Sequence, residues 1–189
     1  MDVAELTGSQ SRTRAAILGA TASVLARDRT ATLPMIAAAA EVARSTVHRY
    51  FADRDRLIHE TTLDSIRVID ETIADAAIDQ GPARDAMRRL ITSLVPEGDR
   101  IVFLFADPAV LRDIPGEQLP NSTPILDLIV RGQREGVFDP EISAEWIRIA
   151  LFGLMIKASR EAAHGLVDRH TIVPTLTRIF ERGVAREPS

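Results

Sequence analysis

The run from Thr32 to Leu57, TLPMIAAAAEVARSTVHRYFADRDRL, constrains the fold of this chain more than any other stretch of its sequence. Its apolar residues recur at helical spacing in two short segments, which a three-residue turn, Glu41-Val42-Ala43, separates. The small side chains of Ala37 and Ala40 allow two helix backbones to cross closely at a steep angle. The pattern therefore predicts a helix-turn-helix.

The second predicted helix has an apolar side and a polar side. Val47 and Phe51 lie on the apolar side, so we expect them to be buried. The opposite side carries arginines, hydroxyls and a histidine, which can bind phosphates and the edges of bases. An ordinary helical corner with a solvated basic face would have the same pattern, and this interpretation stays open. The residues expected to contact DNA are Arg44, Ser45, Thr46, His48, Arg49 and Tyr50.

These residues resemble the signature of the TetR family of transcriptional regulators. In that signature, an I-A-x-x-A-G-V-S core leads into T-[LV]-Y-x-[YH]-F and then into x-x-[KR]-x-x-L. The resemblance implies an all-α fold with an N-terminal three-helix domain that binds DNA and a larger C-terminal helical domain for ligand binding and dimerisation. It also implies a phosphate contact for Arg54. The matching residues are Ile36, Ala37, Ala40, Val42, Thr46, Val47, Tyr50, Phe51, Arg54 and Leu57.

Three residues depart from the signature. Glu41 replaces the usual turn glycine, which would cost about 1–2 kcal/mol if this residue adopts a left-handed conformation. Ala43 replaces the usual serine and removes a side-chain cap from the second helix, an effect of about 1 kcal/mol. His48 replaces a tyrosine, so its reach toward a phosphate is shorter and its charge can titrate.

Charge is distributed unevenly along the chain. The 189 residues have a formal net charge of −4, which by itself argues against nucleic-acid binding. Between Arg12 and Arg56, however, eight arginines stand against four acidic residues, a local balance of +4. We therefore expect a DNA-binding domain over residues 1–53, in which residues 1–10 form a flexible arm, and an acidic domain over residues 54–189.

The absence of several residue patterns excludes or disfavours whole classes of chemistry. The chain has no cysteine, so disulfides and thiol-based redox sensing are excluded. It also has no glycine-rich phosphate loop and no G-x-S-x-G nucleophile motif. Glu161 and His164 form one E-x-x-H pair, but a di-iron bundle needs a second pair, and the sequence has none. We expect neither an enzyme, nor a cofactor, nor a bound metal.

Apolar periodicity predicts helices along the rest of the chain. Ser11 is expected to cap the first helix, and Asp53 to cap a long helix that runs to about Asp79 and links the two domains. The apolar run from Ile101 to Phe105 is interpreted as a buried helix segment because its neighbours are helical. The other helices are expected at 83–95, 107–114 and 124–136, from Asp139 or Ser143 to Gly165, and from Asp168 onward.

Apolar residues of the C-terminal domain could surround a cavity between helices, where helical bundles commonly bind ligands. Plain core packing is the alternative. Because the lining would be aliphatic, we expect a hydrophobic or amphipathic small molecule. The residues proposed for this pocket are Met87, Leu90, Ile91, Leu94, Phe103, Leu104, Leu111, Ile125, Leu128, Ile129, Phe152 and Met155.

The last two predicted helices carry more apolar surface than one buried face needs, which indicates an oligomer interface. A single recognition helix contacts few base pairs, whereas a two-fold dimer places two of them about 34 Å apart, one turn of DNA. In the family that the chain resembles, these helices form a four-helix bundle between subunits. The residues expected at the interface are Trp146, Ile149, Leu154, Ile172, Leu176, Ile179 and Phe180.

Together these features predict a homodimeric, ligand-responsive regulator, most simply a repressor, that binds a near-palindromic DNA operator and is released by a small-molecule effector. The alternative is a helical binding or interaction protein without sequence-specific DNA binding. No run approaches the roughly 20 apolar residues of a membrane span, so we expect a cytoplasmic protein with no membrane partner.

Overall fold

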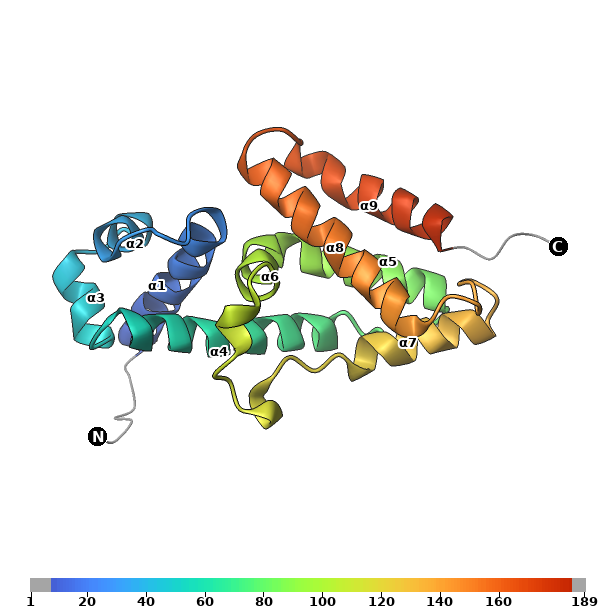
Figure 1. Cartoon of the computed structure of the whole chain (residues 1–189), viewed down its shortest axis with the longest axis horizontal. Helices are drawn as coiled ribbons and strands as arrows, with labels where there is room; N and C mark the ends of the chain where they lie inside the picture. The colour runs from blue at the N-terminus through green and yellow to red at the C-terminus, as the bar shows by residue number, and fades with distance from the viewer. Residues whose placement is uncertain (1–7, 185–189) are drawn as a thin grey trace.

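The computed structural model describes residues 8–184, and its regular structure is helical (Figure 1). The all-α prediction is therefore confirmed for this range. Short 3-10 turns, η1 (Val95–Glu97), η2 (Pro108–Leu111) and η3 (Gly116–Gln118), join some of the helices. The helices are α1 (Gly8–Arg27), α2 (Leu33–Ala39), α3 (Arg44–Tyr50), α4 (Arg54–Asp75), α5 (Ala83–Leu94), α6 (Gly98–Phe105), α7 (Thr123–Arg134), α8 (Ala144–Ala163) and α9 (Arg169–Gly183).

Helices α1, α2 and α3 form one end of the molecule, and α8 and α9 lie side by side toward the other (Figure 1). Helix α4 starts beside α3 and runs toward α5 and α7. Helix α6 packs against α1, α4 and α8. Because α4 and α6 each touch both parts of the molecule, they are the elements through which a change in one part can reach the other.

Two clusters of buried apolar residues stabilise this arrangement. The smaller cluster joins α1, α2 and α3 through Ile17, Ile36 and Val47, and includes Leu57 in the first turn of α4. The larger cluster contains residues from each of the helices α4 to α9, and Leu25 near the end of α1 packs into it. Since α1 and α4 contribute to both clusters, the proposed domain division after residue 53 stays a prediction.

Two helix boundaries differ from those expected. Helix α1 begins at Gly8, so residues 8–10 are helical rather than part of an arm, and Ser11 lies inside the helix instead of capping it. Residues 1–7 of the expected arm lie outside the described range. Helix α4 ends at Asp75 rather than near Asp79, and Ala77 has a φ of 47°, which is incompatible with a continuing right-handed helix.

Most of the predicted helix starts are confirmed. Asp53 accepts a hydrogen bond from the backbone N–H of Arg56 at the start of α4. Ser143 caps α8, and Asp168 caps α9 through the backbone N–H of His170. The apolar run from Ile101 to Phe105 is part of α6, as predicted. Within residues 8–184, no helix is long and apolar enough to cross a membrane.

Candidate nucleic-acid interface

At Glu41, where the signature has a glycine, the turn between α2 and α3 adopts a left-handed conformation. Glu41 has a φ of 54°, a conformation that glycine adopts without strain and that other residues adopt at a cost. The next residue, Val42, donates a backbone hydrogen bond of 3.0 Å to the carbonyl of Ala37, which closes the turn. Ala43 is the N-cap residue of α3 and makes no side-chain cap, as expected for an alanine.

Packing on one side of α3 fixes its orientation. Val47 and Phe51 are each only 1% exposed and lie in the small core with Ile36. The guanidinium of Arg14 from α1 lies 5.8 Å from the centre of the Phe51 ring. Because α3 is held by these contacts to α1 and α2, its opposite side has a defined direction.

That opposite side is polar and largely exposed, and its side chains make no hydrogen bond or ion pair within the described residues. Arg44, Ser45, His48 and Arg49 are all exposed, and Thr46 is half-buried. Among residues 8–184, no side chain forms a hydrogen bond or ion pair with any of these five. Their donors and acceptors are therefore available to a ligand, as DNA recognition from a helix requires.

Tyr50, at the end of α3, lies between the exposed and buried sides. Its ring is half-buried, 6.4 Å from the ring of Phe51, and the guanidinium of Arg49 lies 5.4 Å from its centre. The structure thus places Tyr50 beside the exposed arginine that was predicted to bind DNA, with less of its own surface accessible.

Arg54 differs from the other predicted DNA contacts because its guanidinium is engaged inside the protein. It donates hydrogen bonds of 2.6 Å to the carbonyl of Ala31 and 3.2 Å to the carbonyl of Arg29. These bonds hold the start of α4 against the loop between α1 and α2. A direct phosphate contact by Arg54 stays a prediction, and in this structure the residue positions the helix-turn-helix.

Arg29 was missed by the sequence interpretation, although it connects the same loop to the larger core. Its guanidinium donates a hydrogen bond of 2.9 Å to the carbonyl of Phe103 in α6 and lies 3.4 Å from the carboxylate of Asp107. It also lies 5.9 Å from the centre of the Phe103 ring. Its partners are more than 70 residues away in sequence, so no local pattern could indicate them.

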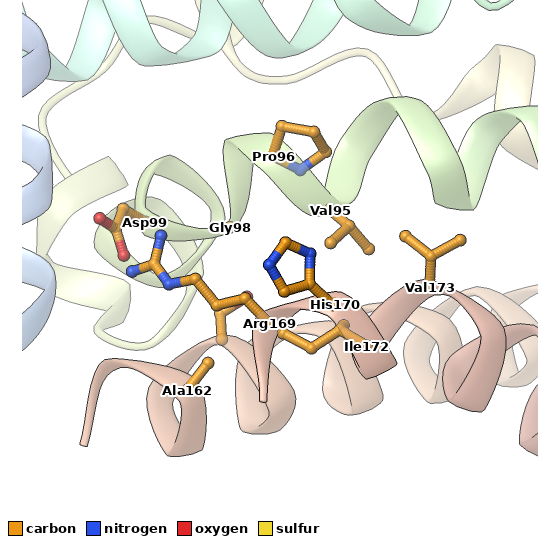
Figure 2. Close-up of a pocket in the computed structure, with 10 residues that line it drawn as sticks. Val95, Pro96, Gly98, Asp99, Ala162, Arg169, His170, Ile172 and Val173 are labelled. Carbon is orange, nitrogen blue, oxygen red and sulfur yellow. The ribbon is translucent and has the colours of Figure 1, made fainter. Parts of the chain in front are cut away.

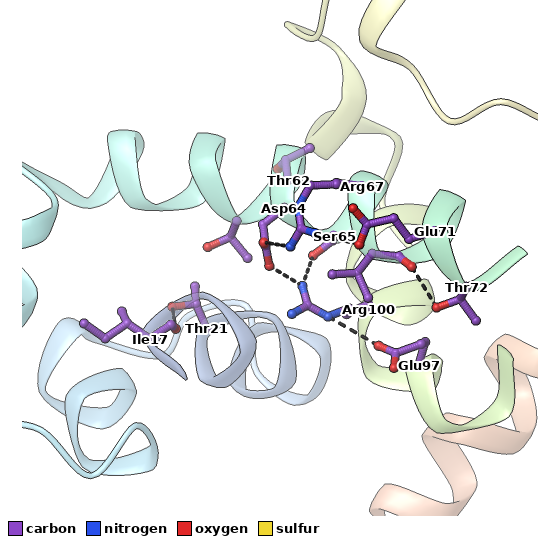
Figure 3. A network of polar contacts seen from close by, with 12 residues as sticks. Ile17, Thr21, Thr62, Asp64, Ser65, Arg67, Glu71, Thr72, Glu97 and Arg100 are labelled. Carbon is purple, nitrogen blue, oxygen red and sulfur yellow. Dashed lines mark hydrogen bonds and ion pairs between the residues drawn. The ribbon is translucent and has the colours of Figure 1, made fainter. Parts of the chain in front are cut away.

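A second bridge joins α6 to α4 (Figure 3). Arg100 donates hydrogen bonds of 2.8 Å to the carboxylate of Asp64 and 3.1 Å to the hydroxyl of Ser65, and its other side pairs with Glu97 at 3.4 Å. Asp64 also pairs with Arg67, at 2.8 Å. The two bridges link α6 to the loop between α1 and α2 and to the long helix α4.

The aliphatic pocket expected in the C-terminal domain is closed in this structure. Ten of its twelve predicted residues are at most 2% exposed, so their side chains pack in the larger core. Leu111 and Phe152 are half-buried at the edge of the same core. The binding of a ligand by these residues therefore stays a prediction. The ten buried residues are Met87, Leu90, Ile91, Leu94, Phe103, Leu104, Ile125, Leu128, Ile129 and Met155.

Cavities occur elsewhere instead. One, which we call the α6–α9 cavity, has a volume of about 380 Å³ and lies where η1 and the start of α6 meet α8 and α9 (Figure 2). Its polar lining comes from Asp99, Ser159, Arg169 and His170. A shallower groove between α4 and α7 includes Asp70. Desolvation raises the pKa of the Asp70 carboxyl above its ordinary value, while a backbone hydrogen bond from Asn121 opposes this shift.

The predicted dimer interface separates into exposed and buried residues. Trp146, Ile149 and Ile179 are 66%, 47% and 48% exposed, which is unusual for large apolar side chains. Leu154 is half-buried. The other three residues, Ile172, Leu176 and Phe180, are at most 5% exposed. They belong to the chain's own core between α5, α8 and α9, so the prediction is wrong for these three.

The E-x-x-H pair does not belong to a cluster of metal ligands in the part of the chain that the structure describes. Glu161 instead forms an ion pair with Lys157, and the hydrogen bond from that ammonium group lowers the pKa of the Glu161 carboxyl. This arrangement is an ordinary i, i+4 pair on the surface of α8.

No family model matches the chain. Individual proteins, however, are similar to it in sequence. The HTH-type transcriptional repressor LfrR of Mycolicibacterium smegmatis is 33% identical over 183 residues, which cover 96% of this chain and 95% of that protein. The HTH-type transcriptional regulator NfxB of Pseudomonas aeruginosa is 27% identical over 154 residues, or 75% of this chain and 80% of the relative.

Solved structures agree with these relatives. The crystal structure of the TetR-like transcriptional regulator LfrR superimposes with a TM-score of 0.75 at 31% identity, covering 95% of this chain and all of that one. A second crystal structure, of LfrR in complex with proflavine, has the same TM-score and identity. The similarity extends over both cores and is not confined to the helix-turn-helix.

Proposed function

The chain belongs to the TetR family of transcriptional regulators, and we propose that it represses transcription by binding a near-palindromic operator as a homodimer that a small hydrophobic ligand releases. One observation carries this proposal: the outer side of α3 has a row of exposed side chains without partners in the described residues. Such a helix side is the part that enters the major groove in helix-turn-helix proteins.

The distribution of charge supports DNA as the partner. Eight of the chain's arginines lie between Arg12 and Arg56, within or beside the small core, whereas the chain as a whole is acidic. A basic domain on an acidic protein attracts the phosphate backbone locally and keeps the rest of the chain away from it. In this arrangement Arg44 and Arg49 contact bases or phosphates of the DNA. Arg54 holds the start of α4 in place through its hydrogen bond to the carbonyl of Ala31.

Dimerisation supplies the second recognition helix. The exposed apolar residues of α8 and α9, Trp146, Ile149 and Ile179, offer a surface that a second copy can cover. Two-fold symmetry then presents two copies of α3 to successive major grooves of a near-palindrome.

Ligand response is supported by the relative LfrR, whose structure has been solved with proflavine. In the present chain the aliphatic core is closed, so a ligand that enters it must separate α5, α7 and α8. Ligand binding would thereby favour a second arrangement of the C-terminal helices. Since α4 and α6 contact both ends of the molecule, that arrangement would change the separation of the two copies of α3.

The test is fluorescence anisotropy with DNA from upstream of the gene, measured at several salt concentrations. We expect binding that weakens with salt, and the Arg44→Ala/Arg49→Ala double variant should bind more weakly with a shallower salt dependence. Arg160→Ala, which removes an exposed arginine at the far end of α8, should leave binding unchanged. Equal binding by both variants would instead support a helical interaction protein that retains the helix-turn-helix without using it.

A further inference from the structure

The α6–α9 cavity lies outside the aliphatic core and has features of a separate binding site. Its volume of about 380 Å³ is within the range of pockets that hold small molecules, roughly 300–1,000 Å³. At Gly98 the start of α6 packs tightly against α8, where an added Cβ would lie 2.2 Å from the Ser159 hydroxyl oxygen. The backbone at the start of α6 therefore forms the floor of the cavity.

One side of the cavity is apolar. Val95 and Pro96 from η1 face Ile172 and Val173 from α9 (Figure 2). These side chains can accept a short, branched hydrocarbon chain and remove it from water, which stabilises the bound state by about 25 cal/mol per Å² of apolar surface.

The charges of the cavity are not balanced. The carboxylate of Asp99 already accepts hydrogen bonds of 2.6 Å from Ser23 and 3.3 Å from Arg27, both in α1. Arg169, in contrast, forms no ion pair with any residue in the described range. The hydroxyl of Ser159 also has no hydrogen-bond partner there. Figure 2 shows the guanidinium of Arg169 directed toward the side of the cavity where Asp99 lies. The group left without a partner is thus a cation.

From this combination we propose that the α6–α9 cavity binds a small amphipathic carboxylate. The carboxylate pairs with the guanidinium of Arg169 and accepts hydrogen bonds from Ser159 and the imidazole of His170. Its hydrocarbon chain packs between η1 and α9, against Val95 and Val173. Arg169 and His170 are exposed, so the polar contacts mainly orient the carboxylate, and the apolar wall supplies much of the binding free energy.

His170 of the proposed site and Ile179 of the dimer surface lie on different sides of α9. His170 and Ile179 are nine residues apart, about two and a half helical turns, so they point in opposite directions. Ile179 is exposed on the side where we place the second subunit, while His170 and Val173 line the cavity. Dimerisation through Ile179 therefore leaves the side of α9 that carries His170 uncovered.

Occupation of the cavity bears on the DNA-binding end because its floor is the start of α6. Asp99 contacts α1 through Ser23 and Arg27, and the next residue, Arg100, contacts α4 through Asp64. A ligand that shifts the start of α6 thus acts on the contact with α1 and on the contact with α4. This effect on operator affinity rests on the proposed function, whereas carboxylate binding does not.

Isothermal titration of the full chain without DNA tests the site, with isocaproate as the probe. We expect saturable binding that Arg169→Gln weakens by roughly tenfold or more, because the charged partner is lost. Arg169→Lys, which retains the charge, should restore part of the affinity. Arg178→Gln is the matched control, since Arg178 is an exposed arginine of the same helix outside this cavity, and it should bind like the unaltered chain.

Isoamylamine, which has the same hydrocarbon chain with the opposite charge, should not bind in this assay. Absence of saturable isocaproate binding, equal weakening by Arg169→Gln and Arg178→Gln, or tighter binding of the amine would each overturn the proposal. If thermal unfolding shows that Arg169→Gln does not fold, Val173→Glu provides a second variant, because a carboxylate on the cavity wall should repel the probe. Since no DNA is present, a failure of operator binding leaves this result unaffected.

Discussion

The backbone of Glu41 is strained because the helix-turn-helix requires a left-handed residue at this position. Its φ of 54° is required for the chain to turn from α2 into α3, and its Cβ makes this conformation costly. The side chain is exposed and offers no buried contact in return. The cost was foreseeable from the sequence, because the position of the turn could be located between two apolar repeats.

Replacing Glu41 with glycine should therefore stabilise the protein by about 1 kcal/mol, since glycine adopts a positive φ without a steric penalty. The measurement is the free energy of unfolding in urea. Glu41→Ala serves as the control, because it removes the charge and keeps the Cβ, and it should leave stability nearly unchanged. A glycine variant that is less stable than the original would show that the turn is not strained.

Arg54 is a residue whose place in the structure could not be inferred from its neighbours. Its guanidinium could have pointed outward, but it binds two carbonyls of the loop between α1 and α2. We expect Arg54→Ala to lower the free energy of unfolding by roughly 2–3 kcal/mol, because two charge-assisted hydrogen bonds are lost from a half-buried position.

The neighbouring Arg56 provides the comparison for Arg54. It is 59% exposed and pairs with Glu60 at 2.6 Å on the surface of α4, so Arg56→Ala should change stability by less than about 0.5 kcal/mol. Urea unfolding of both variants without DNA separates the two roles of Arg54. If Arg54→Ala unfolds like Arg56→Ala, the internal hydrogen bonds contribute little, and a role in phosphate binding becomes the better account.

At the scale of helices, apolar spacing predicted which elements form but not how their apolar sides are used. It identified α2, the turn and α3, and the buried segment in α6, because these depend on local patterns. It could not distinguish a packed core from a lined cavity, since Met87 or Leu90 has the same periodicity in either case. It also assigned Ile172 and Leu176 to a dimer surface, although each is buried within the chain.

The exposed stripe of α8 gives a test at this scale. Trp146, Ile149 and Gly153 lie on one side of the helix, and all three are exposed. If this stripe forms the proposed dimer interface, Ile149→Glu should convert the dimer into a monomer, because a charge is placed among apolar side chains, while the fold of each subunit is retained. Sedimentation equilibrium measures the mass, and circular dichroism measures helicity.

Leu119→Glu is the control for this substitution. Leu119 is also an exposed apolar residue, at 41%, but it follows η3 at a distance from α8 in sequence. This variant should remain a dimer. If Ile149→Glu also remains a dimer, the stripe is not the subunit interface.

At the scale of the whole molecule, function depends on how rigidly the two ends are connected. Arg29 and Arg100 join α6 to the first loop and to α4, and each does so with a hydrogen bond shorter than 3 Å. In the proposed dimer, the two copies of α3 would then be held at a fixed separation, because α8 packs against α6 and α6 packs against α4. Operator recognition by such a molecule requires half-sites at one particular spacing.

The most direct test of this account is the affinity for operator DNA in which the distance between half-sites is changed. Insertion of about 5 base pairs, half a turn of DNA, rotates one half-site to the far side of the duplex and should abolish tight binding by the dimer. Removal of one half-site should have a similar effect, measured by anisotropy at constant salt. Affinity that does not change with spacing or with the loss of a half-site would contradict the proposal that two copies of α3, held by a rigid dimer, bind the operator together.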